Sequence, residues 1–276
     1  MDKLLALLTL PLLGCVVGPE STSGDTGGPG SEETALHISG DTNAGMAYQV
    51  DKLTVVDAGA TLTIPAGATI SFAANTSIDV RGTVKVEGTK SSPVHVSPVH
   101  PGEHHYGFTV STGGALVMSY GIQVGGGITD NGGTVTVTDS QMSQASGDFL
   151  VVGAGTVDVS YSAIGLEPGA GTDTTHCDLH FGGTGLTVKV THSNISTSSF
   201  GLMLYGGTGI DLTYDNWFSN TTHIDTAPGV SGDVSHGWFE KTIPKAGPGA
   251  TLTANNLATE RLPSATVDPV NGAGPR

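Results

Sequence analysis

Six segments share one pattern of apolar and polar residues: VMSYGI (117–122), VTDSQM (137–142), VSYSAI (159–164), VTHSNI (190–195), LTYDNW (212–217) and VSHGWF (234–239). Each one opens with an aliphatic residue and ends, five positions later, with a large apolar residue. Their first residues lie 20, 22, 31, 22 and 22 positions apart. A repeat of about 22 residues, made of short β-rich segments and glycine-rich turns, is typical of stacked coils of β-strand. The interval of 31 predicts one coil with a nine-residue insertion, which we place at residues 167–175.

The residues before these segments continue the repeat at a finer scale. Between residues 36 and 98, short stretches alternate apolar and polar residues, and Gly, Pro or Asn separates them. The stretches lie 6 to 10 positions apart, about a third of a coil, which predicts three strands per coil. Successive coils should stack about 4.8 Å apart, giving about eight or nine coils. In each of the six segments both apolar ends must point inward, so their odd separation predicts a bend between them.

The composition agrees with an all-β chain. Only 13% of the 276 residues are charged, 42 are Gly, and Val, Ile and Thr dominate the ordered stretches. We therefore predict a single-stranded parallel β-helix of about 22 residues per coil at residues 36–240. A flexible tether rich in Gly, Ser and acidic residues precedes it at residues 15–35, and a C-terminal cap and tail follows at residues 241–276.

Three stretches identify a resemblance: ATLTIPAGATISF (60–72), VRGTV (80–84) and GTKSSPV (88–94). They resemble the opening coils of secreted bacterial right-handed parallel β-helix proteins, the pectate-lyase-like superfold. PGEHHYG (101–107) stands where that family often has a turn similar to PGDWGG. Lyases, hydrolases, adhesins and structural modules share this fold, so the resemblance implies the architecture and no single activity.

The N-terminus has the features of an export signal. Lys3 precedes an apolar run, residues 4–13, that is too short to span a bilayer. The run ends in the motif LLGC, which resembles the lipobox of bacterial lipoproteins. That resemblance implies cleavage of a signal peptide, residues 1–14, and acylation of Cys15. The protein would then be exported and anchored by lipid to the cell envelope, in the outer membrane or at the cell surface.

The formal charge of −15 argues against nucleic acid as a partner. Between Lys90 and Lys189 the chain has eight acidic residues and no Lys or Arg. An acidic polysaccharide would therefore be repelled unless a divalent cation such as calcium intervenes. We expect no other cofactor.

Stacking the coils aligns equivalent residues in columns. The third position of the last four segments gives Tyr161, His192, Tyr214 and His236, which should stack along the helix axis. One interpretation is a purely structural stack. The other is a surface strip for a neutral glycan or envelope polymer, with sugar rings on the tyrosines and Asp158 hydrogen-bonding the rim.

Two sets of residues suggest weaker chemical hypotheses. Asp211 and Asp233 fall on adjacent rungs, and with two nearby histidines they are the candidates for the carboxylates of a hydrolase. A further candidate is a metal site made by His176, Asp178 and His180, placed on one face of a strand with Cys177 buried on the other.

The absence of Arg between residues 81 and 261 makes the site of a lyase of this fold hard to build. We therefore favour a non-catalytic carbohydrate-binding or structural and adhesive module. The alternative is a polysaccharide-active hydrolase or lyase of the parallel β-helix superfold.

Overall fold

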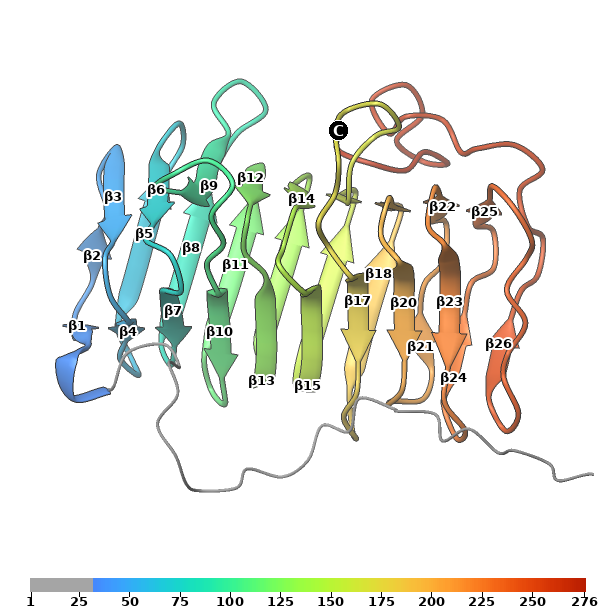
Figure 1. The fold of residues 1–276 in the computed structure, drawn as a ribbon, viewed down its shortest axis with the longest axis horizontal. Coiled ribbons are helices and arrows are strands. Elements are labelled where there is room, and N and C mark those ends of the chain that lie inside the picture. The colour runs from blue at the N-terminus through green and yellow to red at the C-terminus, as the bar shows by residue number, and fades with distance from the viewer. Residues whose placement is uncertain (1–31) are drawn as a thin grey trace, which may run out of the picture.

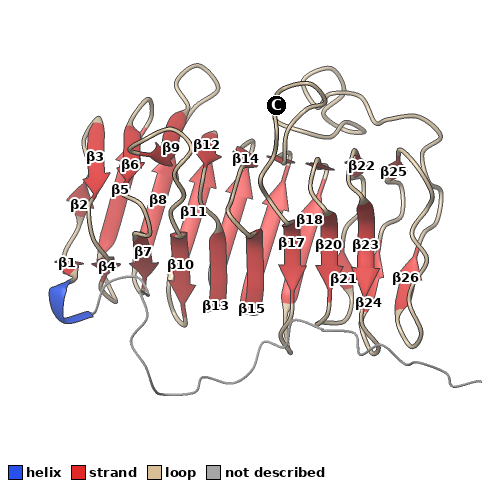
Figure 2. Cartoon of the chain, in the orientation of Figure 1, coloured by secondary structure: helices blue, strands red, loops and turns tan. Residues whose placement is uncertain are grey.

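The structure is a computed structural model, and it describes residues 32–276. The chain winds into a parallel β-helix in which three strands make one coil (Figure 1). Every pair of neighbouring strands in the coils is parallel, and helix is confined to one short 3-10 turn, η1 (Glu32–Thr34), among the described residues (Figure 2). The all-β fold class, the repeat of about 22 residues and the three strands per coil are thereby confirmed.

Three stacks of strands form the faces of the helix. The first face comprises β1 (Leu36–Ile38), β4 (Thr54–Val56), β7 (Ser77–Val80), β10 (Gly107–Ser111), β17 (Cys177–Phe181), β20 (Phe200–Leu204) and β23 (Thr222–Thr226). The second face comprises β2 (Thr42–Asn43), β5 (Thr61–Pro65), β8 (Thr83–Glu87), β11 (Ala115–Ser119), β18 (Thr187–Thr191), β21 (Ile210–Asp211), β24 (Ser231–Asp233) and β26 (Thr251–Thr253). Two long strands run through both of these faces, β13 (Ile128–Thr138) and β15 (Asp148–Ser160).

The third face is a separate sheet of nine strands. It comprises β3 (Ala47–Val50), β6 (Thr69–Phe72), β9 (Val94–Pro98), β12 (Gly121–Val124), β14 (Gln141–Ser143), β16 (Ala163–Ile164), β19 (Asn194–Ser196), β22 (Asn216–Phe218) and β25 (Trp238–Phe239). Nine full coils therefore run from Leu36 to Phe239, and β26 begins a tenth.

The bend expected inside each repeated segment lies at its third position in all but the first. In five segments the third residue has positive φ, between 47° and 63°: Asp139, Tyr161, His192, Tyr214 and His236. In the first segment the fourth residue, Tyr120, has positive φ, 48°. A left-handed residue turns the chain between the second and third faces, so the apolar residues on both sides of it point inward. This explains the odd spacing that a straight strand does not allow.

The fourth position of the segments satisfies the backbone at this bend. Ser162 Oγ accepts a hydrogen bond of 3.2 Å from the N–H of Ser140 in the preceding coil. Ser193 Oγ does the same for Ser162, and Asp215 Oδ1 does so for Ser193. Each serine hydroxyl also donates to a carbonyl two residues earlier in its own coil. This buried column, the serine ladder, connects four successive coils.

The expected register is wrong at the first segment. Met118, not Val117, pairs with Val137 of the next coil. Met118 is accordingly 1% exposed and Val117 is 43% exposed. The closing end is displaced in the same way, because Gln123, and not Ile122, pairs with Met142 and is fully buried. The pattern of apolar ends therefore placed the whole segment one position too early. With this shift Ser119 joins the column of Ser and Thr that follows the opening residue.

The chain beyond the coils folds back along the third face. Residues 261–276, here called the return segment, run from the end of the helix over β22 and β19 toward the loop between β16 and β17 (Figure 1). The predicted insertion forms that loop, and the carboxylate of Asp173 holds it by accepting hydrogen bonds from the N–H groups of Gln144 and Thr175. The return segment and this loop meet above the third face.

Candidate functional site

The ring column forms as the repeat predicts. The ring centroids of Tyr161 and His192 are 4.9 Å apart, those of His192 and Tyr214 are 4.7 Å apart, and those of Tyr214 and His236 are 4.6 Å apart. The last two pairs are within 7° of parallel. Because the rings stack along the helix axis, each covers the face of the next.

This geometry changes how a sugar can reach the tyrosines. Both faces of Tyr214 are covered by histidines, and Tyr161 has His192 on one face and the guanidinium carbon of Arg276 3.9 Å from its ring centroid on the other. All four rings of the column are only half-buried. His192 and Tyr214 have a stacked ring on each side, so what these two present to solvent is their edges. Stacking of sugar rings on the tyrosine faces is therefore blocked in this conformation.

Asp211 and Asp233 lie on adjacent rungs, as predicted, in a column here called the acidic column. Asp158 pairs with Lys189, Lys189 with Asp211 and Asp211 with Asp233 on the second face. One oxygen of Asp211 accepts hydrogen bonds from Thr213, and one oxygen of Asp233 accepts from the N–H of Ser235. Each carboxylate thus uses an oxygen to hold its own strand end.

Among the described residues, neither of these two carboxylates forms a hydrogen bond with a histidine of the ring column. Across residues 32–276, no group of three or more His, Cys, Asp or Glu side chains is placed to hold a metal ion. Among these residues, the pair on adjacent rungs therefore supplies two carboxylates without a third beside them. Ca²⁺ takes six to eight oxygen ligands.

The structure places His176, Asp178 and His180 differently from the prediction. Asp178 is fully buried and its Oδ2 accepts a hydrogen bond of 3.0 Å from Ser198 Oγ. Cys177, Asp178 and Leu179 are all buried, so the alternation of sides fails at the start of β17. Both neighbouring strands pair with β17 at Cys177 and again from Leu179 onward, but not at Asp178. The strand is irregular at this residue, and the Asp178 side chain points into the protein. Burial raises the pKa of Asp178 well above its ordinary value.

A carboxylate of the preceding coil joins the two histidines instead. Asp148 Oδ1 lies 2.9 Å from His176 Nδ1, and Asp148 Oδ2 lies 2.5 Å from His180 Nδ1. Burial raises the pKa of Asp148, but the hydrogen bonds with His180 and His176 outweigh it, so that the pKa lies below its ordinary value. In the neutral state both histidines therefore carry the proton on Nδ1, and each Nε2 is left as a base.

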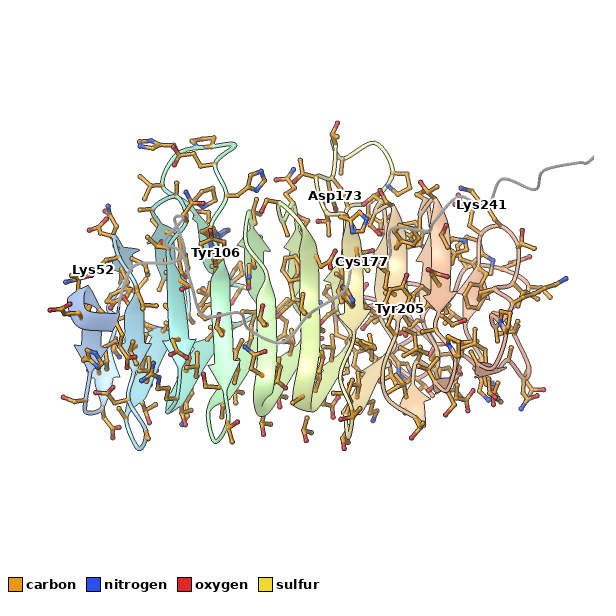
Figure 3. The ribbon with its side chains drawn as sticks, turned by 60° about the horizontal axis from the view of Figure 1, so that its bottom comes forward. Lys52, Tyr106, Asp173, Cys177, Tyr205 and Lys241 are labelled. Atoms are coloured by element: carbon orange, nitrogen blue, oxygen red, sulfur yellow. The ribbon has the colours of Figure 1, made fainter. Side chains whose placement is uncertain are left out.

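Tyr205 completes this cluster, the Asp148 cluster, on the first face. Its ring meets that of His180 edge to face at 5.7 Å, and its hydroxyl donates a hydrogen bond of 2.6 Å to Asp225. Burial and the bond to Asp225 raise the pKa of Tyr205. Figure 3 shows Tyr205 near Cys177, whose thiol is buried and whose pKa burial likewise raises. The cluster contains a base, an orienting carboxylate and a phenol.

A shallow pocket of about 320 Å³ adjoins Asp148. Its wall includes His105, from the turn PGEHHYG at residues 101–107. The His105 ring stacks on Phe72 with centroids 4.2 Å apart, and burial lowers the pKa of His105 to about 4. A Cβ at Gly126 would lie 2.3 Å from this ring, so the neighbouring coil is shaped around the histidine. His105 is thus a core residue, and the exposed ring of the turn is Tyr106.

A second hollow lies between the third face and the return segment. It is a groove of about 800 Å³ whose floor comes from β12, β14, β16 and β19. Its polar lining is mostly uncharged: Gln123, Gln141, Ser143, Asn194, Ser196 and Ser264. Among the lining residues only Glu167 and Arg261 are charged, and they form an ion pair of 2.6 Å.

Comparisons of the chain with family models, curated proteins and solved structures found no match. The class of the protein is therefore defined by its fold: it is a parallel β-solenoid. Its candidate sites are the groove on the third face and the Asp148 cluster on the first.

Sequence reasoning missed the groove because the return segment has no repeat. It also missed Asp148, which belongs to the coil before the histidines and has no counterpart in their pattern. The signal that was available is the insertion itself: the loop expected at residues 167–175 supplies Glu167, one wall of the groove.

Proposed function

We propose that this protein is a non-catalytic binding module of the bacterial cell envelope that takes a neutral, extended polymer, such as an uncharged glycan, in the groove of the third face. The supporting observation is the groove itself. Its volume of about 800 Å³ is within the range of ligand sites, and its only charged lining residues neutralise each other. A neutral chain meets amide and hydroxyl groups there without the repulsion that a net charge of −15 imposes on a polyanion.

The repeat gives the groove a form suited to a polymer. Gln141, Ala163 and Asn194 stand at equivalent rungs of three successive strands of its floor. Rungs repeat about every 4.8 Å, so the amide of Gln141 recurs at Asn194, two rungs or about 9.6 Å along the axis. A polymer with a regular repeat can use the same hydrogen bonds again at each step, which a single small molecule cannot.

The proposal includes export and a lipid anchor on Cys15, which lies outside the described residues. It rests on the LLGC motif and the apolar run before it. It also includes the right-handed, pectate-lyase-like form of the solenoid, which rests on the resemblance of residues 60–94. Within residues 32–276, no helix is long and apolar enough to cross a membrane.

The test is a matched pair of bulky substitutions in the purified protein, screened on neutral and acidic glycans with and without calcium. Ala163→Trp fills the groove, and Ala115→Trp places the same side chain on the second face at a similarly half-buried alanine. We expect neutral glycan binding that Ala163→Trp weakens at least about tenfold and Ala115→Trp leaves unchanged. Equal binding by both variants, or binding restricted to acidic glycans, would contradict the proposal.

The Asp148 cluster favours one alternative, a polysaccharide hydrolase. A histidine whose Nδ1 is held by a carboxylate presents Nε2 as a general base. The same screen distinguishes the two functions by product analysis. Bond cleavage abolished by His180→Gln and unaffected by Ala163→Trp would replace the binding module with an enzyme whose site is on the first face.

A further inference from the structure

The return segment is held at both of its ends by an arginine. Arg261 and Arg276 lie fifteen positions apart, and each reaches from the segment to a different part of the third face. Between them, two apolar side chains face outward: Val267 is 79% exposed and Val270 is 74% exposed. Leu262 is the large apolar side chain of the segment that is half-buried, so apolar burial contributes little to holding the rest of the segment.

The first arginine site combines a carboxylate with an aromatic ring. The guanidinium of Arg261 donates two hydrogen bonds to the two oxygens of Glu167, of 2.6 and 3.0 Å. Its central carbon lies 4.0 Å from the ring centroid of Phe218. A bidentate carboxylate and a ring face together match the planar, delocalised cation of Arg and not the point charge of Lys.

The second site has the same construction and is more enclosed. Arg276 donates to both oxygens of Asp139 at 2.9 Å, and its guanidinium carbon lies 3.9 Å from the ring centroid of Tyr161. The Asp139 side chain is only 4% exposed. The Arg276 N–H also donates to Asp139, at 3.0 Å, so the site binds backbone as well as side chain.

Asp139 stands where the ring column is interrupted. The adjacent rungs at this position have Tyr120 and Tyr161, and Asp139 supplies no ring. The guanidinium plane of Arg276 covers the face of Tyr161 that a ring at this rung would cover. The column thus leaves a slot for one planar cation, with the carboxylate that neutralises it already in place.

We propose that these two carboxylate–ring pairs, Glu167 with Phe218 and Asp139 with Tyr161, form a recognition surface for an extended polypeptide that bears two arginines. The return segment occupies this surface in the same chain, and an arginine-bearing segment of another polypeptide enters it by exchange. Between the arginines the contacts are mainly to backbone: the Asn216 amide pairs with the N–H and C=O of Leu262, and the Tyr161 hydroxyl donates to the carbonyl of Pro269. Such contacts leave the exposed side chains of the segment free to vary, whereas buried Ala265 and Ala273 and the left-handed Gly274, with φ of 100°, require small residues at their positions. The proposal does not depend on the bound polymer proposed above.

The test measures binding in trans to the full-length chain. A fluorescent, C-terminally amidated peptide with the sequence of residues 259–276 is titrated into the wild-type chain and into the Arg261→Ala/Arg276→Ala variant, and anisotropy is followed. In the variant the cis segment has lost both guanidiniums, so we expect the peptide to bind at least about tenfold more tightly than to the wild type. Adding Asp139→Asn and Glu167→Gln to the variant should abolish that gain.

Two controls separate recognition of arginine from general effects. A peptide with both arginines replaced by lysine keeps its charge and should bind at least about tenfold more weakly. Arg81→Ala removes an arginine that pairs with Glu32 and Asp79 away from this surface, and it should leave peptide binding as in the wild type. Equal affinity for the lysine peptide, or a gain that survives loss of both carboxylates, would overturn the proposal.

A second measurement is independent of the alanine variant. In the Arg261→Lys/Arg276→Lys chain both positive charges remain, and hydrogen exchange of residues 263–275 should become at least about tenfold faster while the coils keep their protection. Unchanged exchange in this segment would show that the arginines do not hold it, and the proposal would fail.

Discussion

Asp215 occupies a position that three preceding coils give to serine. Its Oδ1 accepts a hydrogen bond of 2.8 Å from the N–H of Ser193, just as each serine hydroxyl accepts one from the preceding coil. Its Oδ2 is buried and has no hydrogen-bond partner. Burial raises the pKa of Asp215 well above its ordinary value, so the folded chain keeps a proton that the unfolded chain releases. Between these two pKa values, stability must fall as pH rises.

We therefore expect Asp215→Ser to stabilise the protein at pH 7, by about 1–3 kcal/mol, because it restores the hydroxyl and removes the unsatisfied oxygen. The gain should shrink as pH falls toward the ordinary pKa of an aspartate, where the wild-type residue is protonated in both states. Urea unfolding at several pH values measures this. Asp158→Ser, at an exposed carboxylate, is the control and should leave the pH profile unchanged. A pH-independent gain would refute the explanation.

At the scale of an element, the ring column joins the bends of successive coils. Tyr214 is covered on both faces and its backbone is left-handed, with φ of 63°. Stacking stabilises this side chain while its backbone conformation costs about 1–2 kcal/mol relative to glycine. Two opposing contributions thus meet at one residue.

Substitutions at Tyr214 separate these contributions. Tyr214→Phe keeps the ring and should be nearly neutral. Tyr214→Ala loses two stacked contacts and should cost about 1–3 kcal/mol. Tyr214→Gly loses the same contacts but relieves the left-handed backbone, so it should be about 1 kcal/mol more stable than the alanine variant. Thermal unfolding ranks the three variants; a glycine variant less stable than the alanine variant would contradict the strain at this bend.

At the scale of the whole molecule, the coils form a rigid rod with different chemistry on each face. The second face bears the acidic column, the first bears the Asp148 cluster, and the third bears the groove and the return segment. Because each coil contacts only its neighbours, stability is spread along the rod, and the outer surface is free to vary by coil.

The cellular site of this rod can be tested at Cys15. If the thiol is acylated, the wild-type protein should sediment with membranes, and Cys15→Ser should appear in the soluble fraction because no acyl chain can be attached. The change lies outside the coils, so circular dichroism of the released variant should match that of the wild type. Membrane association that survives in Cys15→Ser would remove the lipid anchor from the proposal.

The architecture of the coils follows from the repeat in the amino-acid sequence. A repeat of about 22 residues with apolar residues at both ends of each segment buries those residues when the coils stack and equivalent residues lie on top of one another. The same argument predicted the order of the ring column and the adjacent rungs of Asp211 and Asp233, because stacking brings residues at one position of the repeat next to each other. It failed by one residue at Val117, where the bend and not the apolar pattern sets the register.

The contacts made by the columns and by the return segment depend on the three-dimensional fold. The repeat cannot show that stacked rings cover one another's faces, that Asp178 turns inward, or that Asp148 holds two histidines of the next coil. Nor can it place the return segment, which lacks the period and whose Arg276 meets Asp139 across 137 positions of the chain. A periodic pattern specifies contacts between neighbouring coils, whereas a contact this distant depends on how an aperiodic segment folds back over them.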